Sequence, residues 1–187
     1  MMFQSFNKLC IFVFLMSVTV FYSCNDAQSK GDFIQEVTSF IGKNIQFASL
    51  FHDDRNSLDT ILWSKRNKII IYLDSIDCTS CAFNEIRKWN IYTQKLKELN
   101  TYIVIICSHP NVKAVRDIKK AVHIDFPIFF DFERNFELIN DIPRKTIFQI
   151  FVVGTTNQVI WVGLPIRSKK SWEEFCSVIM LSNTNSV

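Results

Sequence analysis

The chain has 187 residues, of which 48% are hydrophobic, and it carries a formal net charge of +3 at pH 7. This length and composition are typical of one globular domain with a hydrophobic core. The charges form no basic patch or run, which argues against a nucleic-acid partner. Phenylalanine is abundant (18 residues) and glycine scarce (4), so we expect a well-filled core with few glycine-dependent turns.

The N-terminal residues 1–23 are expected to be a targeting signal. Lys8 precedes an apolar segment, residues 9–22, which ends at a serine followed by Cys24. A basic flank, an apolar core of this length and a small residue before the cut characterise a secretory signal, and the segment is shorter than the about 20 residues that cross a bilayer. The cysteine after the small residue suggests a bacterial lipoprotein signal, with Cys24 lipidated and residues 24–32 as a tether. Ordinary secretion or an uncleaved anchor is the alternative.

The folded domain is expected over residues 33–187. Residues 33–41 can form a short helix that Gly42 ends. The alternating residues 43–48 are typical of an edge strand, and residues 51–67 are typical of a polar loop. The histidine and the two adjacent aspartates in this loop are more typical of solvated side chains than of metal ligands.

The stretch that organises the chain is a strand pattern followed by a Cys-x-x-Cys motif. The isoleucine-rich run from Lys68 to Leu73 predicts a buried strand, and a polar break follows it. Cys78 and Cys81 come next, and a helical pattern begins at the second cysteine. Apolar residues recur there every three or four positions, which predicts a helix with one apolar face. These residues are Phe83, Ile86, Trp89, Tyr92, Leu96 and Leu99.

A cysteine pair at the start of a helix has a chemical rationale. Helix positions three apart are neighbours, so the sulfurs of Cys78 and Cys81 can reach disulfide distance. The first cysteine is expected among unpaired N–H groups at the positive end of the helix dipole, which can lower a thiol pKa from about 8.5 to roughly 3.5–7.5. Cys78 is therefore the candidate nucleophile, and Cys81, which is expected to face the protein, is the candidate resolving thiol. Asp77 places a negative charge beside Cys78 and opposes the dipole, so the sequence predicts neither a reductant nor an oxidant.

The rest of the chain continues as alternating helices and strands. Strand, helix and strand over residues 68–107 predict a right-handed parallel crossover, which places Cys107, Ser108 and His109 on the same sheet rim as the Cys-x-x-Cys motif. With the short strand at 126–131 and the helical turn after it set aside, the order is β-α-β-α-β-β-α. This predicts a mixed α/β fold with a central sheet and helices on both faces. The expected elements after the second strand are a helix at 111–122, the strand at 126–131, a turn and helix at 132–140, hairpin strands at 146–154 and 158–163, a helix around 172–179, and a loose tail at 182–187.

Several segments together resemble a known family. Ile69-Ile-Ile-Tyr-Leu-Asp74, with Asp77-Cys-Thr-Ser-Cys-Ala82 after it, resembles the active-site segment of thioredoxin-fold proteins. More narrowly, it is similar to that of the TlpA/ResA-like, membrane-tethered thiol–disulfide oxidoreductases of bacterial envelopes. Phe126-Pro-Ile-Phe-Phe-Asp131 is similar to the family's Phe-Pro-Val-x-x-Asp segment, and residues 149–160 are similar to its strand–turn–strand hairpin. The resemblance covers roughly residues 40–181.

This resemblance implies a thioredoxin-like fold and thiol–disulfide exchange on envelope proteins, with Cys78 and Cys81 as the redox pair. Asp77, Thr79 and Ser80 would shape the redox loop. No cofactor is implied. The partners would be protein thiols or disulfides and a membrane electron donor, and the protein would be anchored by lipid to the membrane, facing the periplasm or the cell exterior.

One position departs from the family pattern. Members usually carry a cis-proline just before the first hairpin strand, where its backbone meets the substrate cysteine. Phe148 occupies that position here, while Pro143 and Pro127 lie farther upstream. We therefore expect either a differently built substrate groove or an altered redox exchange.

Two further interpretations of the cysteines are open. The pair can form a static disulfide in a binding or structural lipoprotein, because an envelope compartment is oxidising. Alternatively, Cys78, Cys81, Cys107 and His109 would supply the four ligands that zinc prefers. A single Cys-x-x-Cys motif supports zinc only weakly, since Cys107 and Cys176 are typical of core residues and His109 of a loop or helix cap, and no metal site is predicted. A peroxidatic site is not expected, because the proline and threonine that such families place before their cysteine are missing.

Overall fold

The computed structural model describes residues 31–47, 50–51, 66–74 and 79–184. The predicted signal, Cys24, most of the predicted 51–67 loop, Asp77 and Cys78 lie outside these residues. The chain divides into two compact units, Met1–Phe40 and Ile41–Val187. A helix over residues 31–40 is the described part of the first unit. None of the helices in the described ranges combines the length and the apolar character needed to cross a membrane.

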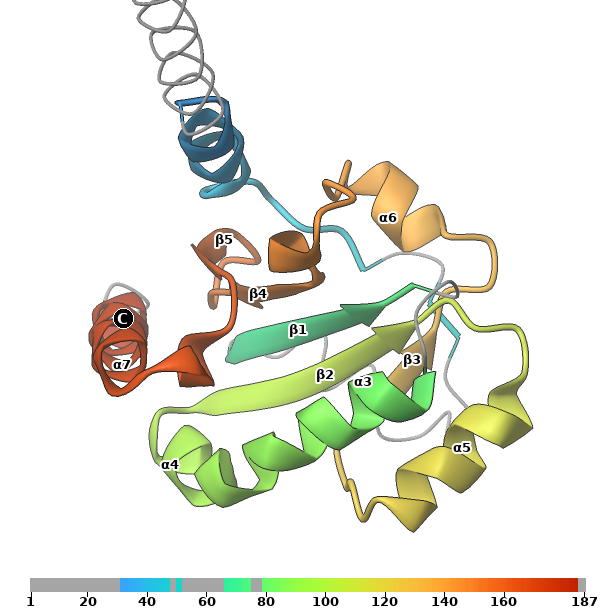
Figure 1. The fold of residues 1–187 in the computed structure, drawn as a ribbon. Coiled ribbons are helices and arrows are strands. Elements are labelled where there is room, and N and C mark those ends of the chain that lie inside the picture. The colour runs from blue at the N-terminus through green and yellow to red at the C-terminus, as the bar shows by residue number, and fades with distance from the viewer. Residues whose placement is uncertain (1–30, 48–49, 52–65, 75–78, 185–187) are drawn as a thin grey trace, which may run out of the picture. The chain divides into compact units, whose positions relative to one another are not determined.

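Five strands form one mixed sheet in the described part of the second unit (Figure 1). Their order is β3-β2-β1-β4-β5. The first three run parallel, whereas β4 is antiparallel to both of its neighbours. The parallel crossover and the antiparallel hairpin are those that the sequence predicts. The strands are β1 (Asn67–Leu73), β2 (Thr101–Cys107), β3 (Ile128–Phe130), β4 (Ile150–Val153) and β5 (Val159–Val162).

Helices and helical turns connect these strands. The predicted single helix after the cysteines is three successive segments, which keep the predicted residues Phe83, Trp89 and Leu96 buried. The predicted helix after β2 is confirmed, and the side chain of Asn111 caps it by accepting a hydrogen bond from the Ala114 N–H (3.0 Å). The elements are α3 (Thr79–Ile86), η1 (Arg87–Tyr92), α4 (Thr93–Glu98), α5 (Val112–Ala121), α6 (Asn135–Ile139), η2 (Thr146–Gln149), η3 (Pro165–Arg167) and α7 (Lys169–Thr184).

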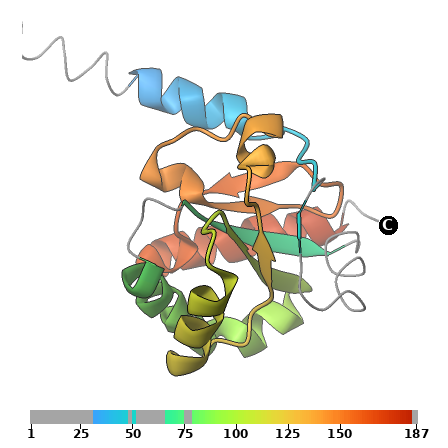
Figure 2. The same ribbon diagram turned by 90° about the vertical axis from the view of Figure 1, so that its right-hand side faces the viewer.

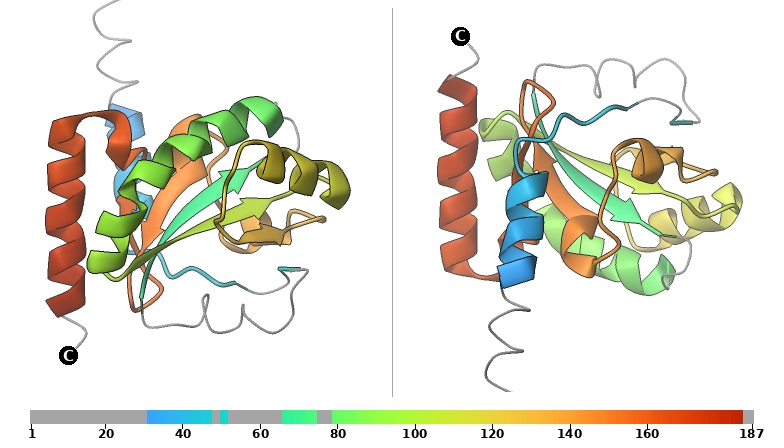
Figure 3. Two further views of the ribbon diagram at one scale, coloured as in Figure 1. Left: turned by 90° about the horizontal axis from the view of Figure 1, so that it is seen from below. Right: turned by 90° about the horizontal axis from the view of Figure 1, so that it is seen from above.

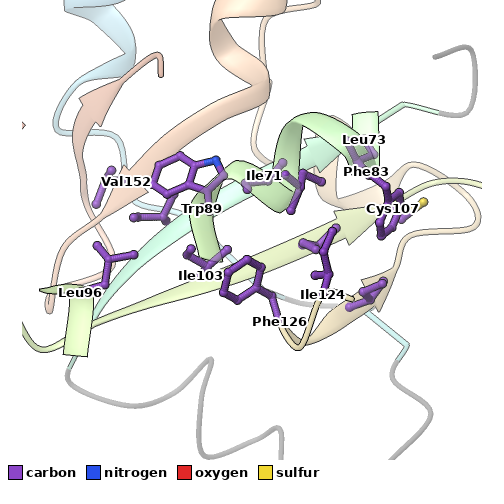
Figure 4. Close-up of a cluster of buried hydrophobic side chains, with 14 of the residues drawn as sticks. Ile71, Leu73, Phe83, Trp89, Leu96, Ile103, Cys107, Ile124, Phe126 and Val152 are labelled. Atoms are coloured by element: carbon purple, nitrogen blue, oxygen red, sulfur yellow. The ribbon is translucent and has the colours of Figure 1, made fainter. Parts of the chain in front are cut away.

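Helices cover both faces of the sheet, as the sequence predicts. Figures 2 and 3 show α3 and α5 on one side and α6 on the other. Alternate residues of β1 explain the two layers, because successive side chains of a strand point to opposite faces. Ile71 and Leu73 join the core cluster with Phe83 of α3 (Figure 4), whereas the Tyr72 ring stacks on Phe136 of α6 with centroids 6.1 Å apart.

Two strand predictions are wrong in part. The strand predicted from residue 146 begins at Ile150, because Thr146–Gln149 form a 3-10 turn in which the Phe148 N–H donates to the Lys145 carbonyl (2.9 Å). This turn buries the Phe148 ring completely, which the alternating pattern of an extended strand would not require. In place of the edge strand predicted at 43–48, the described residues of that segment hold an isolated bridge between Asn44 and Gln158.

The last helix is longer than predicted. Residues 182–184 continue α7, although the sequence favours a loose tail from residue 182. Polar side chains hold this turn to the start of β1 and the end of α4: Ser182 Oγ donates to Asn67 Oδ1 (3.1 Å) and Asn183 Nδ2 donates to the Leu99 carbonyl (3.1 Å). The hydrophobic periodicity of the sequence does not predict such polar contacts.

Candidate active site

Cys81 lies in the first turn of α3 and is exposed, so the prediction that it faces the protein is wrong. The helix begins at Thr79, two residues before the start that the sequence predicts, so Cys81 is its third residue. Phe83, two positions on, is fully buried and anchors this turn against the sheet (Figure 4). Thr79 and Ser80 belong to the helix, whereas Asp77 and Cys78 lie outside the described residues. The pairing of Cys78 with Cys81 therefore stays a prediction.

The C-terminal ends of β1 and β2 share one rim of the sheet. Leu73 pairs with Cys107 in the parallel register. Beyond that pair, both the N–H (3.0 Å) and the hydroxyl (3.2 Å) of Ser108 donate to the Leu73 carbonyl. This is the sheet rim that the predicted crossover places next to the Cys-x-x-Cys motif. The helix α3 begins at Thr79, five residues after Asp74.

Cys107 and His109 have structural surroundings at this rim. Cys107 is buried in the core cluster on the α3 side of the sheet, and burial raises the pKa of its thiol. His109 Nδ1 accepts a hydrogen bond from the Asn111 N–H (3.1 Å), which suits the predicted loop role. Within the described part of the chain, no three His, Cys, Asp or Glu side chains are placed to hold a metal ion.

An ionic network that the sequence does not reveal lies directly before the cysteine loop. Arg134 Nη2 lies 2.9 Å from Asp74 Oδ2 and 2.6 Å from Glu137 Oε2, and Arg144 Nε reaches Glu137 Oε1 at 2.7 Å. Burial by itself would raise the pKa of Glu137, but the hydrogen bonds from Arg144 and Arg134 hold it below its usual value. Asp74 directly follows β1, so the network attaches the start of the cysteine loop to α6.

Tyr72 extends this network into the interior. Its hydroxyl lies 3.3 Å from Glu137 Oε2 and 3.4 Å from Asp131 Oδ2. Burial raises the pKa of Tyr72, and the negative charges of Asp131 and Glu137 raise it further, so the hydroxyl stays protonated as a donor. Asp131 also accepts from the Phe136 N–H (3.1 Å) at the start of α6. Two sequence features belong to this cluster: a tyrosine inside an apolar strand, and Asp131 at the end of the Phe-Pro-Ile-Phe-Phe-Asp segment.

The position expected for a cis-proline holds a buried phenylalanine. The described residues contain no cis peptide bond, so both Pro127 and Pro143 are trans. Phe148 lies in η2 with its ring fully buried, while its neighbours Ile147 and Gln149 are partly exposed. The surface next to the start of β4 is therefore formed by Ile147 and Gln149 and not by the Phe148 ring.

A cavity of about 860 Å³ lies against α3. It runs between α3, η2, the end of β5 and η3, and Ala82, the residue after Cys81, lines it. Most of its other walls are apolar side chains. They include Ile86, Trp89, Ile147, Trp161, Leu164 and Ile166.

Neither a protein-family model nor a curated protein matches this sequence. Solved structures do match. The peroxidoxin BcpB from Mycobacterium tuberculosis has a TM-score of 0.54 at 14% identity, over 75% of this chain and 96% of that one. The thioredoxin domain of a thiol-disulfide oxidoreductase from Bacteroides vulgatus has a TM-score of 0.55 at 10% identity, over 74% and 97%. The chain has a thioredoxin-like fold.

A third structure gives the same result. A protein described as the thiol:disulfide interchange protein DsbE from Chlorobium tepidum has a TM-score of 0.53 at 14% identity, over 76% of this chain and 96% of that one. Identities of this size show the fold alone. Within this thioredoxin-like fold, Cys81 lies on the helix that follows the central strand β1.

Proposed function

We propose that this protein carries out thiol–disulfide exchange through Cys78 and Cys81. The observation that carries the proposal is the exposed Cys81 in the first turn of α3, at the rim of a thioredoxin-like sheet. Cys78 precedes the first residue of that helix in the sequence. A thiol at that position is favoured as thiolate by the unpaired N–H groups and the dipole of the helix.

The exchange needs two steps and no cofactor. The Cys78 thiolate attacks one sulfur of a substrate disulfide, the substrate S–S bond breaks, and a Cys78–substrate disulfide forms. The first substrate sulfur leaves as a thiolate and takes a proton. Cys81, as thiolate, then attacks the Cys78 sulfur and releases the second substrate thiolate. The substrate gains two electrons, and the protein ends with a Cys78–Cys81 disulfide that a second dithiol must reduce.

The substrates are proposed to be envelope proteins. The support is the apolar segment before Cys24, which is typical of a lipoprotein signal. Lipidated Cys24 would hold the domain at a membrane facing the periplasm or the cell exterior, and a membrane electron donor would return the pair to its reduced form.

The test is disulfide reduction by the purified full-length protein, with insulin as substrate and dithiothreitol as the reductant. Cys78→Ser is expected to abolish the catalysed rate. The reduced Cys81→Ser variant, mixed with insulin in the absence of dithiothreitol, is expected to accumulate a mixed disulfide that mass spectrometry detects. Cys176→Ser is the matched control, because Cys176 lies outside the motif, on α7, and packs against the core. Full activity of either motif variant would rule out this mechanism.

One observation favours a second candidate, a binding lipoprotein with a static disulfide. Phe148 leaves the site without a cis-proline. A glutathione redox series separates the two candidates, because a catalytic pair exchanges with glutathione at a measurable potential whereas a static disulfide resists it.

The lipid anchor has its own test. Cys24→Ala is expected to move the protein from the membrane to the soluble fraction and to block cleavage by lipoprotein signal peptidase. A variant that matures normally and stays membrane-bound would contradict the lipoprotein proposal.

A further inference from the structure

The N-terminal helix, which spans residues 31–40 and is blue in Figure 1, has one apolar side. Apolar residues recur along it every three or four positions and continue to the residue after its end. On a helix with about 3.6 residues per turn, these positions fall on one side. We call this side the apolar stripe. It consists of Phe33, Ile34, Val37, Phe40 and Ile41.

Much of the apolar stripe is in contact with water. The side chain of Ile34 is 61% exposed, and Phe33 and Ile41 are exposed as well, whereas Phe40 is buried. Scattered apolar residues on a surface need no explanation, but large ones that share one side of a helix mark contact with another molecule or with a membrane.

The polar groups near the stripe suit an uncharged apolar surface. Asp32 and Glu36 are the charged residues of this helix, and both are acidic, so the helix does not attract anionic lipid headgroups. Thr38 lies at the edge of the stripe, and its hydroxyl donates to the Ile34 carbonyl (2.7 Å). Because this hydroxyl is already hydrogen-bonded, it can leave water at a lower cost.

The chain on either side of the helix is short. Cys24, the proposed lipidation site, precedes Gly31 by seven residues, and seven extended residues span at most about 25 Å. After the helix, the Gly42 N–H already donates to the Val159 carbonyl of β5 (2.7 Å), so no spacer separates the helix from the sheet domain. No described helix is suited to crossing a membrane. A lipid on Cys24 would therefore bring this helix to the surface of a bilayer.

We propose that the N-terminal helix lies in the interface of a membrane of zwitterionic phospholipid, with Phe33 and Ile34 among the outer parts of the acyl chains. The proposal rests on the lipid anchor proposed for Cys24. The anchor and the helix act as two attachments, which together hold a protein to a bilayer more firmly than one does. They keep the sheet domain, and its exposed Cys81, at the membrane surface.

The experiment uses the full-length chain, produced in a host that processes lipoproteins and reconstituted into phosphatidylcholine vesicles. Ile34→Trp places a fluorescent reporter on the stripe, and Gln35→Trp places one on the opposite side. Both positions are exposed, so neither substitution disturbs the core. The wild-type protein has four tryptophans, whose signal is subtracted. Lipid brominated on the upper part of its acyl chains is expected to quench the Ile34→Trp reporter at least about twofold more than the Gln35→Trp reporter.

A pair of charge variants assigns the contact to the stripe. With Phe33→Trp as the reporter, Ile34→Glu is expected to remove the quenching, because it places a carboxylate among the acyl chains. Gln35→Glu adds the same charge on the opposite side and is expected to keep it. Addition of phosphatidylglycerol is not expected to strengthen the quenching, since Asp32 and Glu36 repel an anionic surface.

The outcomes separate this proposal from the lipid anchor. Mass spectrometry first shows whether Cys24 carries a lipid, and its absence would overturn both. With the lipid present, equal quenching of the Ile34→Trp and Gln35→Trp reporters would overturn the helix contact alone. A blue-shifted Ile34→Trp emission that brominated lipid does not quench would assign the stripe to a protein partner or a second copy. Quenching that requires phosphatidylglycerol would overturn attachment by apolar insertion.

Discussion

Arg134 links Asp74, the residue that follows β1, to Glu137 of α6, with its Nη2 atom 2.9 Å from the first carboxylate and 2.6 Å from the second. The backbone of Arg134 adopts the left-handed conformation, with φ of +58°. Non-glycine residues adopt that region at a cost of roughly 1–2 kcal/mol. The contacts of its guanidinium must offset this cost.

We predict that Arg134→Gln lowers the free energy of unfolding by about 2–3 kcal/mol, because it leaves two partly buried carboxylates without their shared cation. Arg144→Gln is the matched control. It removes a cation from the same Glu137, but the Arg144 side chain is 70% exposed, so a loss within about 1 kcal/mol is expected. Urea unfolding of the two variants measures the difference. Equal losses would show that the link to Asp74 adds no stability.

The close approach at Gly163 gives a second prediction. Gly163→Ala must accept both a positive φ and a Cβ 3.3 Å from Ile147 Cγ1. Gly42→Ala, at φ of +82° with open space around the added atom, carries the backbone cost alone, about 1 kcal/mol. Thermal unfolding is therefore expected to show a larger decrease in Tm for Gly163→Ala than for Gly42→Ala. The reverse order would mean that Ile147 moves aside freely.

Lys68 gives the stability a pH dependence. Its side chain is buried at the start of β1, its Nζ donates to the Arg66 carbonyl (3.0 Å), and burial lowers the pKa of Lys68 to about 8. Between pH 8 and the ordinary lysine pKa near 10.4, the unfolded chain holds a proton that the folded chain has lost, so this residue stabilises the fold as pH rises. This stability is lost as pH falls through 8.

Lys68→Met removes that titration. Relative to this variant, the wild-type protein is expected to gain free energy of unfolding between pH 7.5 and pH 9.5, measured by urea unfolding at each pH. A difference between the two proteins that does not change over this range would contradict a lowered pKa for Lys68.

The buried thiol of Cys107 is expected to resist modification. Burial raises its pKa, so little thiolate is present at neutral pH and the sulfur is inaccessible. In the reduced, folded protein, iodoacetamide is expected to label Cys81 rapidly and Cys107 only after unfolding, as peptide mass spectrometry can show. Rapid labelling of Cys107 in the folded protein would place it within reach of substrates.

The sequence predicts the sheet well, because its strongest patterns are the ones that build it. The isoleucine runs of β1 and β2 are buried on both faces, and Phe83 and Trp89 recur at the helical spacing that packs α3 and η1 onto the sheet. Such residues contribute most of the hydrophobic burial, and their periodicity is present in the amino-acid sequence itself. The thioredoxin-like order follows from them.

The rest depends on polar contacts between distant residues, which periodicity does not encode. Arg134 lies in a turn with no motif, and its partner Asp74 is 60 residues away. The sequence pattern around Phe148 is typical of a strand, whereas the structure has the 3-10 turn η2 at this position. The hydrophobic pattern also does not predict the cavity, because it forms where α3, η2 and the loop after β5 meet. The Cys-x-x-Cys motif singles out Cys81, but it predicts a thiol that faces the protein, whereas Cys81 is exposed.

Both outer strands of the sheet are partly occupied by the chain that precedes β1. Phe51 and Phe130 exchange two backbone hydrogen bonds at the β3 edge (2.9 and 2.7 Å), and the Val159 N–H of β5 donates to the Lys43 carbonyl (2.9 Å). Exposed strand edges are templates for pairing with other molecules. A protein shortened to begin at residue 66 would offer both edges to its neighbours, and we expect it to self-associate more strongly than a protein that begins at residue 41.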